Sequence, residues 1–188
     1  MSNIFFISDT HFSHENAWRT FKLEDGVTPL RPFTSTEEMD ETMIERWNSV
    51  VRDKDTIYHL GDVAISRKAL PLVKRLNGRK ILVKGNHDIF KLHEYVDQCG
   101  FADVRAYWQV DGMFLAHIPI HPASLYRWKL QIHGHLHANV VLSPGYVQAD
   151  STIMYHDQKP DPRYVNVSVE QINYTPISLE ELRKKILS

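Results

Sequence analysis

Short runs of hydrophobic residues recur along the chain, and each predicts a buried β-strand. Five of these runs end abruptly at polar residues, and they occupy residues 3–7, 56–60, 80–84, 113–116 and 129–132. Four to six apolar or β-branched residues in a row are typical of a strand that is buried on both faces. Because ligand-binding groups collect beyond the carboxyl ends of strands in α/β sheets, we expect the polar residues after these runs to come together.

Segments with helical spacing lie between the predicted strands. Residues 34–51 begin with a candidate cap, Ser35, and carry Met39, Met43 and Trp47 at intervals of four, which predicts a helix packed on the core. Residues 66–78 predict a second helix that ends before Gly78, and residues 91–99 predict a shorter third helix.

The pattern changes near the end of the chain. Residues 163–178 alternate between polar and apolar positions, which predicts a half-exposed strand, a turn and the start of another strand. Residues 178–187 predict a final helix with Ser178 as its N-cap. Strand–helix alternation followed by a strand-rich end favours an α/β (α+β) fold with two packed sheets and helices outside. No linker, repeat or low-complexity tract divides the sequence, so we expect one domain over residues 1–188.

Composition excludes some classes of protein. The 22 basic and 23 acidic side chains nearly cancel, so overall charge provides no attraction to nucleic acid or to a membrane surface. Cys99 is the only cysteine, which excludes an intramolecular disulfide and a thiolate zinc cluster. No apolar run is long enough for a membrane span or for a signal peptide, and we expect a cytoplasmic protein. The oligomeric state stays open.

Oxygen and nitrogen ligands follow the five predicted strands, in a chain with 11 histidines. The candidate ligands are Asp9, His11, Asp62, Asn86, His117, His135 and His137. Carboxylate, imidazole and amide groups without sulfur suit Mn²⁺, Fe or Zn²⁺. Seven ligands are too many for one tetrahedral ion, and they predict two ions that share a bridging carboxylate. Such a pair polarises a phosphoryl oxygen and generates a hydroxide for in-line attack.

Each ligand motif is common by itself, but their order is specific. The chain reads D-x-H at residues 9–11, GD at 61–62, GNHD at 85–88, a lone His117 and GHxH at 134–137, each after an apolar run. With these motifs the sequence resembles the calcineurin-like metallophosphoesterases from residue 4 to about residue 137, and its ending resembles small prokaryotic and phage members. The resemblance implies a four-layer αββα sandwich of two mixed β-sheets flanked by helices.

The resemblance also implies roles for the candidate ligands. One divalent ion would be held by Asp9, His11 and His137 and a second by Asn86, His117 and His135, with Asp62 bridging the two. Mn²⁺ is the favoured metal, with Fe, Zn²⁺ and Ni²⁺ as alternatives. His87 would then be the catalytic histidine that hydrogen-bonds the phosphoryl group or protonates the leaving oxygen.

Two departures from the protein Ser/Thr phosphatases of this superfamily narrow the expected substrate. Val63 follows Gly61-Asp62 without the downstream Asp-Arg-Gly, and Asp88 follows His87 where those enzymes carry glutamate. These differences argue against a protein phosphatase. Asp88 is the nearest candidate for a catalytic residue that orients His87.

Other residues have two interpretations each. His14 either contacts substrate or is a solvent-exposed loop residue, and Arg31 either holds a phosphate through two hydrogen bonds or forms a surface ion pair. His133 shares a strand face with His135 and His137 and is a packed strand histidine or a residue that supports a ligand, in preference to a ligand itself. Residues 121–130 form either an aromatic lip over the site or, as we favour, a loop packed on the core.

The function expected from these residues is hydrolysis of small phosphodiesters or nucleotide-like phosphate esters by attack of a metal-bridging hydroxide. A phosphomonoesterase or a nuclease of the same superfamily is the alternative, although near-neutral charge disfavours extended binding to nucleic acid. A non-catalytic scaffold with this fold would be expected to lose ligands or His87, and all of them are present.

Overall fold

The first β-sheet carries most of the predicted strands. The computed structural model describes residues 2–128, 130–143, 146–147, 153–154 and 159–187. The sheet has the order β11-β1-β2-β3-β4, formed by β1 (Ile4–Ile7), β2 (Thr56–His59), β3 (Arg79–Val83), β4 (Asp103–Arg105) and β11 (Ile177–Ser178). Strands β1 to β4 are parallel and β11 is antiparallel to β1, so the sheet is mixed.

The second sheet has the order β10-β7-β6-β5. Its strands are β5 (Trp108–Val110), β6 (Met113–Leu115), β7 (Leu130–His133) and β10 (Tyr164–Asn166). Strands β10, β7 and β6 run parallel, and β5 is antiparallel to β6. A separate antiparallel pair is formed by β8 (Tyr146–Val147) and β9 (Ile153–Met154).

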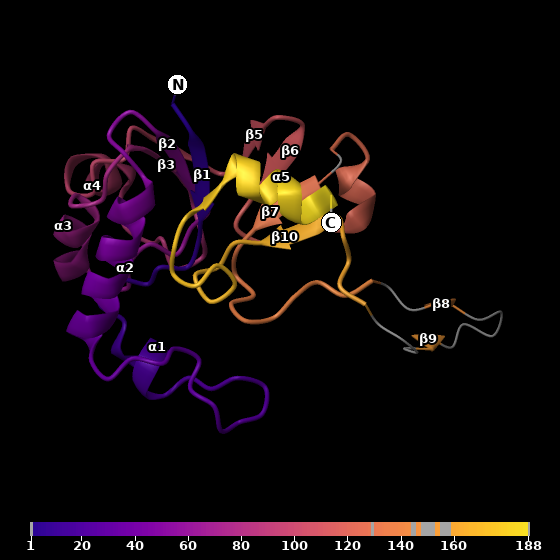
Figure 1. Cartoon of the computed structure of the whole chain (residues 1–188), viewed down its shortest axis with the longest axis horizontal. Coiled ribbons are helices and arrows are strands. Elements are labelled where there is room, and N and C mark those ends of the chain that lie inside the picture. The colour runs from indigo at the N-terminus through magenta and orange to yellow at the C-terminus, as the bar shows by residue number, and fades with distance from the viewer. Residues whose placement is uncertain (1, 129, 144–145, 148–152, 155–158, 188) are drawn as a thin grey trace.

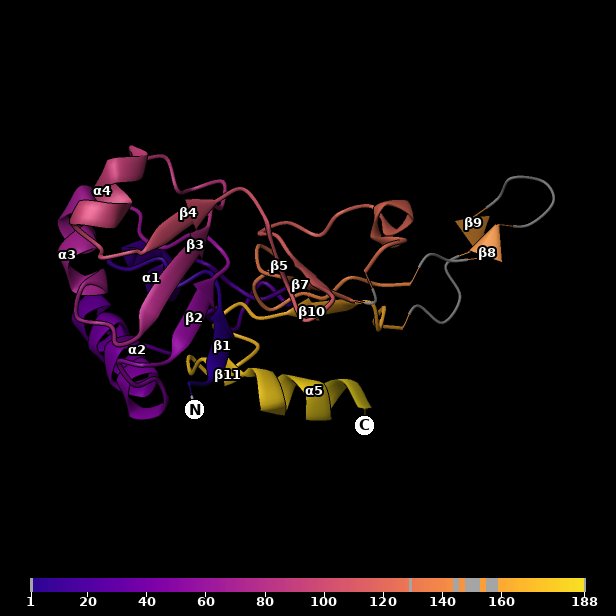
Figure 2. The same cartoon turned by 90° about the horizontal axis from the view of Figure 1, so that it is seen from above.

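Helices flank the first sheet on the side away from the second sheet (Figures 1 and 2). These are α2 (Thr36–Val50), α3 (Leu70–Val73), which continues the 3-10 turn η1 (Arg67–Ala69), and α4 (Leu92–Asp97). The short α1 (Glu15–Arg19) precedes α2, and α5 (Leu179–Leu187) packs along β1 and β11. The expectation of an α/β fold with two mixed sheets and flanking helices is confirmed.

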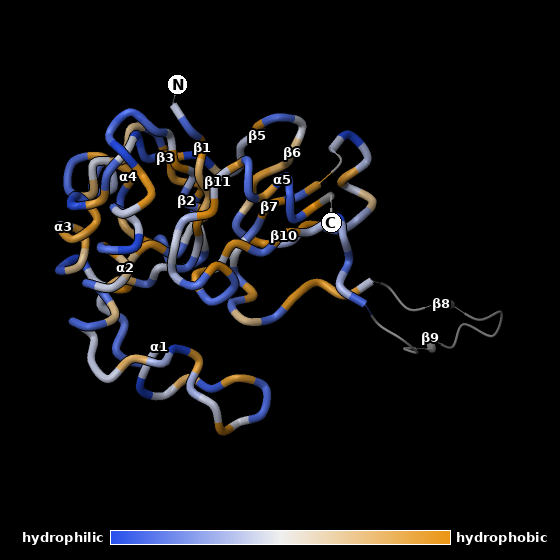
Figure 3. Tube along the Cα trace, viewed as in Figure 1, coloured by the Kyte–Doolittle hydropathy of each residue, from blue (hydrophilic) through white to orange (hydrophobic). Residues whose placement is uncertain are grey.

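Two hydrophobic clusters explain why the strands of the first sheet are apolar on both faces. Ile7, Ile57 and Leu82 belong to a cluster shared with the helices, whereas Phe6 and Tyr58 belong to one shared with the second sheet. Because successive side chains of a strand point to opposite faces, every residue of these runs has an apolar neighbour to contact. Hydrophobic positions accordingly concentrate in the strands (Figure 3).

The outer face of the second sheet is covered differently from that of the first. Phe114 and Leu125 form a small hydrophobic cluster on that face. Leu125 belongs to the 3-10 turn η2 (Pro122–Leu125), and among the described residues this turn, and not a long helix, covers the cluster. Trp128 packs against Phe114 with ring centroids 4.5 Å apart and the rings tilted by 37°, as expected for a packed loop. Tyr126 is 78% exposed, and Lys129 lies outside the described residues.

The local sequence signals account for most element boundaries. Ser35 caps α2, because its Oγ accepts the amide of Glu38 at 3.0 Å. The second expected helix is shorter than predicted: a 3-10 turn with Pro71 just inside the start of α3 replaces a continuous helix over residues 66–78. Within the described residues, no helix is both long and apolar enough to span a bilayer.

The strand expected after residue 163 is present as β10, and β11 follows it after a turn, but the polar face of this segment is not exposed to solvent. The apolar residues Val167 and Val169 are fully buried, but Ser168 is also fully buried and Asn166 is 8% exposed. The polar face of this segment therefore packs inside the protein, where it contacts Asp9 and the main chain of His137.

Candidate metal centre

The carboxyl ends of β1, β2, β6 and β7 converge, and backbone hydrogen bonds continue past the strands. The amide of Asp9 donates to Gly61 O at 2.9 Å, and the amide of His11 donates to Asp62 O at 3.0 Å. The second sheet adds a matching bond from the Gly134 amide to His117 O at 2.9 Å. The loops that carry the predicted ligands are thus fixed to one another by main-chain contacts.

Left-handed backbone conformations mark this place. Five of the seven candidate ligands have positive φ, namely Asp9 (58°), His11 (47°), Asp62 (57°), His135 (69°) and His137 (50°). Such conformations are uncommon for residues with a Cβ, and they cluster at functional sites where the surrounding structure holds them.

Close packing explains two of the glycines in the motifs. A Cβ on Gly134 would overlap Ser8 Oγ and Asp9 Oδ2, and a Cβ on Gly85 would overlap Asp62 Oδ1. The chain therefore approaches the neighbouring motifs more closely at these two positions than any residue with a Cβ would allow.

The candidate ligand atoms form two adjoining groups. In the first, Asp9 Oδ1 lies 3.8 Å from His11 Nε2 and 4.0 Å from His137 Nε2. In the second, Asn86 Oδ1 lies 2.9 Å from His117 Nε2 and 3.0 Å from His135 Nδ1. Ligands bound at about 2.1 Å to one tetrahedral ion would stand roughly 3.4 Å apart, which lies between the distances found in the two groups, so small side-chain shifts would bring either group to the spacing of a metal site.

Asp62 lies between the two groups. Its Oδ2 is 3.6 Å from His11 Nε2 and 3.4 Å from His117 Nε2, and its Oδ1 accepts the amide of His87 at 2.8 Å. Although burial acts to raise it, the contacts with His117 and the His87 amide hold the pKa of Asp62 at about 2. The carboxylate that the sequence suggested as a bridge therefore stands within reach of both groups.

Buried atoms of the first group lack hydrogen-bond partners, and this shows whether a cation suits these residues. Asp9 Oδ1 and both ring nitrogens of His11 are buried and make no hydrogen bond among the described residues. Burial also raises the pKa of Asp9 and, with the help of Arg31, lowers the pKa of His11 well below its ordinary value. Since buried polar atoms in native proteins are normally satisfied, a divalent cation fits this donor set.

Comparison with known proteins gives the family of the chain. The profile of the calcineurin-like phosphoesterases matches residues 2–135. The chain belongs to the calcineurin-like phosphoesterase family. Its metal-binding motifs and two mixed sheets are therefore those of a phosphoester hydrolase family, and the resemblance noted in the sequence is confirmed.

Individual relatives of this phosphoesterase are similar over most of their length. An uncharacterized protein, MJ1445, from Methanocaldococcus jannaschii is 36% identical over 191 residues, covering 99% of this chain and 92% of the relative. The gene 66 protein of Mycobacterium phage L5 is 29% identical and covers 76% and 81%. The crystal structure of AQ665, a protein of unknown function from Aquifex aeolicus, superposes with a TM-score of 0.66 at 27% identity, covering 98% and 100%.

The predicted catalytic histidine lies on the rim of the phosphoesterase site. The His87 side chain is exposed, and its ring centroid is 5.5 Å from that of His11. Asp88 is buried and turned toward the backbone: its carboxylate accepts the amides of Asp62 at 2.8 Å, Val63 at 3.0 Å and Gly85 at 2.8 Å. Asp88 was suggested to orient the His87 ring, but these contacts show a different role. Its carboxylate binds the main chain of the second and third motifs and connects them.

Arg31 also differs from the expectation. Its side chain is fully buried, where a phosphate clamp would have to face the substrate. The guanidinium donates to the carbonyls of Asp9 and Thr10 and, at 2.8 Å, to Glu170 Oε1. Arg31 therefore fixes the main chain of the first motif from inside the protein.

Sequence reasoning missed the residues that support the first group. Glu170 Oε1 lies 3.1 Å from His137 Nδ1, and Ser168 Oγ donates to Asp9 Oδ2 at 2.9 Å. Asn166 donates to the carbonyl of His137 at 2.9 Å. The signal was the polar set at positions 166, 168 and 170, which the alternating pattern places on one strand face.

Two histidines that the sequence left outside the motif are buried and neutral. Burial lowers the pKa of His59 to about 3 and that of His133 to about 4. His59 lies 2.9 Å from Thr10 Oγ1 and accepts the Gly61 amide at 3.2 Å, so it joins the first two motifs. His133 Nδ1 lies 2.7 Å from Gly134 O and supports the turn after β7.

Proposed function

We propose that this phosphoesterase is a dinuclear-metal-dependent phosphodiesterase that hydrolyses small phosphodiesters or nucleotide-like phosphate esters. The observation that carries the proposal is the position of Asp62, whose Oδ2 lies 3.6 Å from a nitrogen of the first group and 3.4 Å from a nitrogen of the second. One carboxylate between two donor groups is the arrangement of a two-metal hydrolase.

The ligand set favours Mn²⁺, with Fe, Zn²⁺ and Ni²⁺ as alternatives, because it offers oxygen and nitrogen donors and no sulfur. Asp9, His11 and His137 would hold one ion, and Asn86, His117 and His135 the other. When bound, such ions polarise a phosphoryl oxygen and lower the pKa of water, which makes it a nucleophile at neutral pH.

His87 supplies what the ligand set lacks, a donor near the leaving group. Its main chain is fixed by the bond from its amide to Asp62 Oδ1, while its exposed side chain faces the ring of His11. The imidazole is therefore free to hydrogen-bond the phosphoryl group or to protonate the leaving oxygen, a role that is worth about 10²–10⁴-fold in rate.

The rim of the site is open to a phosphate ester. Asn86, His87 and His135 all reach the surface, so a phosphate can approach the donor groups directly from solvent. A phosphomonoesterase or a nuclease would use the same residues, but the nearly balanced charge offers little for a long nucleic acid.

Metal depletion and the His87→Asn variant test the proposal together. Chelation should abolish hydrolysis of bis(p-nitrophenyl) phosphate, and Mn²⁺ should restore it. His87→Asn should retain both metals, counted by elemental analysis, and lose about 10²–10⁴-fold in kcat. The exposed His93, changed to Asn, is a matched control that should leave turnover unchanged. Chelator-resistant turnover would refute the mechanism, and loss of both metals from His87→Asn would make His87 a ligand.

A further inference from the structure

A pocket of about 460 Å³ opens directly beside two of the candidate ligands. One wall is the segment from His135 to Asn139, and the other belongs to residues 21–30, here called the arm. We propose that this pocket binds the organic group of the substrate and that this group is an aromatic ring of about nucleobase size. This inference rests on the phosphoesterase activity proposed above and adds a substrate class to it.

The arm is a preformed wall. It follows α1 and projects from the body of the protein (Figure 1). Its two sides are joined by hydrogen bonds from the Leu30 amide to Phe21 O and from the Leu23 amide to Thr28 O, each 2.8 Å long. Asp25 Oδ1 accepts the amides of Val27 and Thr28 and closes the tip. A wall that is ordered before binding loses little entropy when a ligand arrives.

Aromatic contacts connect the metal centre with the arm. The ring of His14 lies 5.6 Å from that of the candidate ligand His11 on one side and 5.4 Å from that of Phe21, edge to face, on the other. His14 Nδ1 is buried and makes no hydrogen bond among the described residues. His14 thus lies between the candidate ligand His11 and the pocket residue Phe21, and its substrate contact, one of its two interpretations, stays a prediction.

The lining of the pocket suits a flat ring with polar edges. Phe21, Leu30 and Leu136 offer apolar surface, and the Phe21 side chain is 42% exposed although it lines a concave site. Glu24 and Asn139 add hydrogen-bonding groups at the same pocket. Aromatic side chains bind flat rings by stacking, whereas a methyl or glycerol group would leave most of this apolar surface wet.

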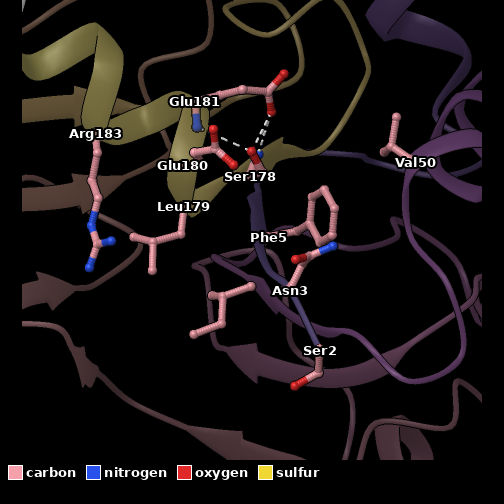
Figure 4. A pocket seen from close by; sticks show the side chains of 10 residues that line it. Ser2, Asn3, Phe5, Val50, Ser178, Leu179, Glu180, Glu181 and Arg183 are labelled. Atoms are coloured by element: carbon pink, nitrogen blue, oxygen red, sulfur yellow. Dashed lines mark hydrogen bonds between the residues drawn. The ribbon is translucent and has the colours of Figure 1, made fainter.

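A larger pocket elsewhere has no such connection. It measures about 660 Å³ and is lined by Ser2, Asn3, Ser178 and Arg183, among others, at the amino end of β1 (Figure 4). The candidate ligand Asp9 follows the opposite end of that strand. Position next to the ligands, and not volume, therefore identifies the substrate pocket.

Binding of two phosphonates to the Mn²⁺-loaded protein tests the inference without turnover, because neither has an ester bond. Calorimetry should show tighter binding of phenylphosphonate than of methylphosphonate. Phe21→Ala should weaken phenylphosphonate about tenfold and leave methylphosphonate unchanged. Phe21→Trp, which keeps a ring, should retain the preference. Val27→Ala is the matched control, since Val27 lies at the tip of the same arm, is 76% exposed and does not line the pocket.

The outcomes separate this inference from the proposed activity. Equal affinities for the two phosphonates, or an equal loss of both in Phe21→Ala, would overturn the pocket assignment while phosphodiester turnover persists. Failure of the Mn²⁺-loaded protein to bind either phosphonate, together with absence of turnover, would overturn the activity and the pocket with it.

Discussion

Single buried residues hold the candidate ligands in place without being ligands themselves. The Glu170 carboxylate lies between Arg31 and His137, and the side chains of both Glu170 and Arg31 are 5% exposed or less. Carboxylates that orient a ligating histidine commonly change metal affinity when they are removed. We therefore expect the candidate metal centre to depend on Glu170 as well as on the residues of the five motifs.

Changing Glu170 to Gln should weaken metal binding at the first group. The substitution keeps the shape but leaves the buried Arg31 without its charge partner, and we expect a loss of about 10–100-fold in Mn²⁺ affinity. Breaking a buried ion pair should also lower the free energy of unfolding by about 3 kcal/mol. Calorimetric titration and urea unfolding measure the two effects.

Glu94 provides the control for that experiment. It is a buried glutamate paired with Arg67 at 2.7 Å, and it lies in the first turn of α4, away from the candidate ligands. Glu94→Gln should leave Mn²⁺ affinity unchanged. An unaltered affinity in Glu170→Gln would show that His137 needs no such support.

The sequence predicts residues by chemistry and order, and it misleads where burial decides the role. The candidate ligands could be identified because five motifs follow five apolar runs. Arg31 was expected either to clamp a phosphate or to form a surface ion pair, and Asp88 to orient a catalytic ring, but both side chains are buried and bind main-chain groups. Nothing in a single sequence reveals that these charged side chains point inward.

At the scale of elements, the centre depends on how closely the strand ends approach. After β7 the chain passes so near the first motif that Gly134 has no room for a side chain. Gly134→Ala should push the Asp9 carboxylate out of place, because a new methyl group in a packed site costs about 1–3 kcal/mol. We expect loss of Mn²⁺ from the first group and a lower unfolding midpoint, measured by metal analysis and urea titration.

Gly112, between β5 and β6, is the matched position for this test. It has φ of 75°, and a Cβ added there would meet nothing within 4 Å. Asparagine tolerates this conformation, so Gly112→Asn should leave metal content intact. Full metal content in Gly134→Ala would show that the strand ends can move apart.

Elements with long, regular signals were predicted well, and short ones were not. The apolar runs correspond to β1, β2, β3, β6 and β7, and the capped stripe corresponds to α2. Strands β4 and β5 were missed because they contain no apolar run, whereas β6, which is equally short, is apolar throughout. The polar face of residues 166–170 was expected to face solvent. Alternation of polar and apolar residues shows that a strand has two unlike faces, but it does not show which part of the protein covers each face.

At the scale of the whole molecule, the candidate ligands come from both sheets, so metal binding should stabilise the entire fold. Ligands that bind only the folded state add about 2.7 kcal/mol at a hundred times Kd, which corresponds to roughly 5–10 °C in Tm for a chain of this size. Addition of Mn²⁺ to metal-free protein should raise Tm by that amount. Thermal unfolding followed by circular dichroism measures it.

The Asp62→Asn variant tests whether the Tm shift depends on Asp62, the carboxylate proposed to bridge the two metal ions. Removal of a charge shared by both groups should impair both together and reduce the Tm shift by more than half. Asp111→Asn, at an exposed ion pair with Arg183, should leave the shift unchanged. A full shift and two retained metals in Asp62→Asn would refute the bridging role.

The supports of the metal centre come late in the chain. All seven candidate ligands precede residue 138, whereas Asn166, Ser168 and Glu170 contact two of them, Asp9 and His137, from a later segment. A ribosome therefore releases every ligand before it releases the side chains that fix Asp9 and His137. An unfinished chain would therefore carry all the candidate ligands without the side chains that fix Asp9 and His137, and we expect it to bind metal more weakly than the finished protein.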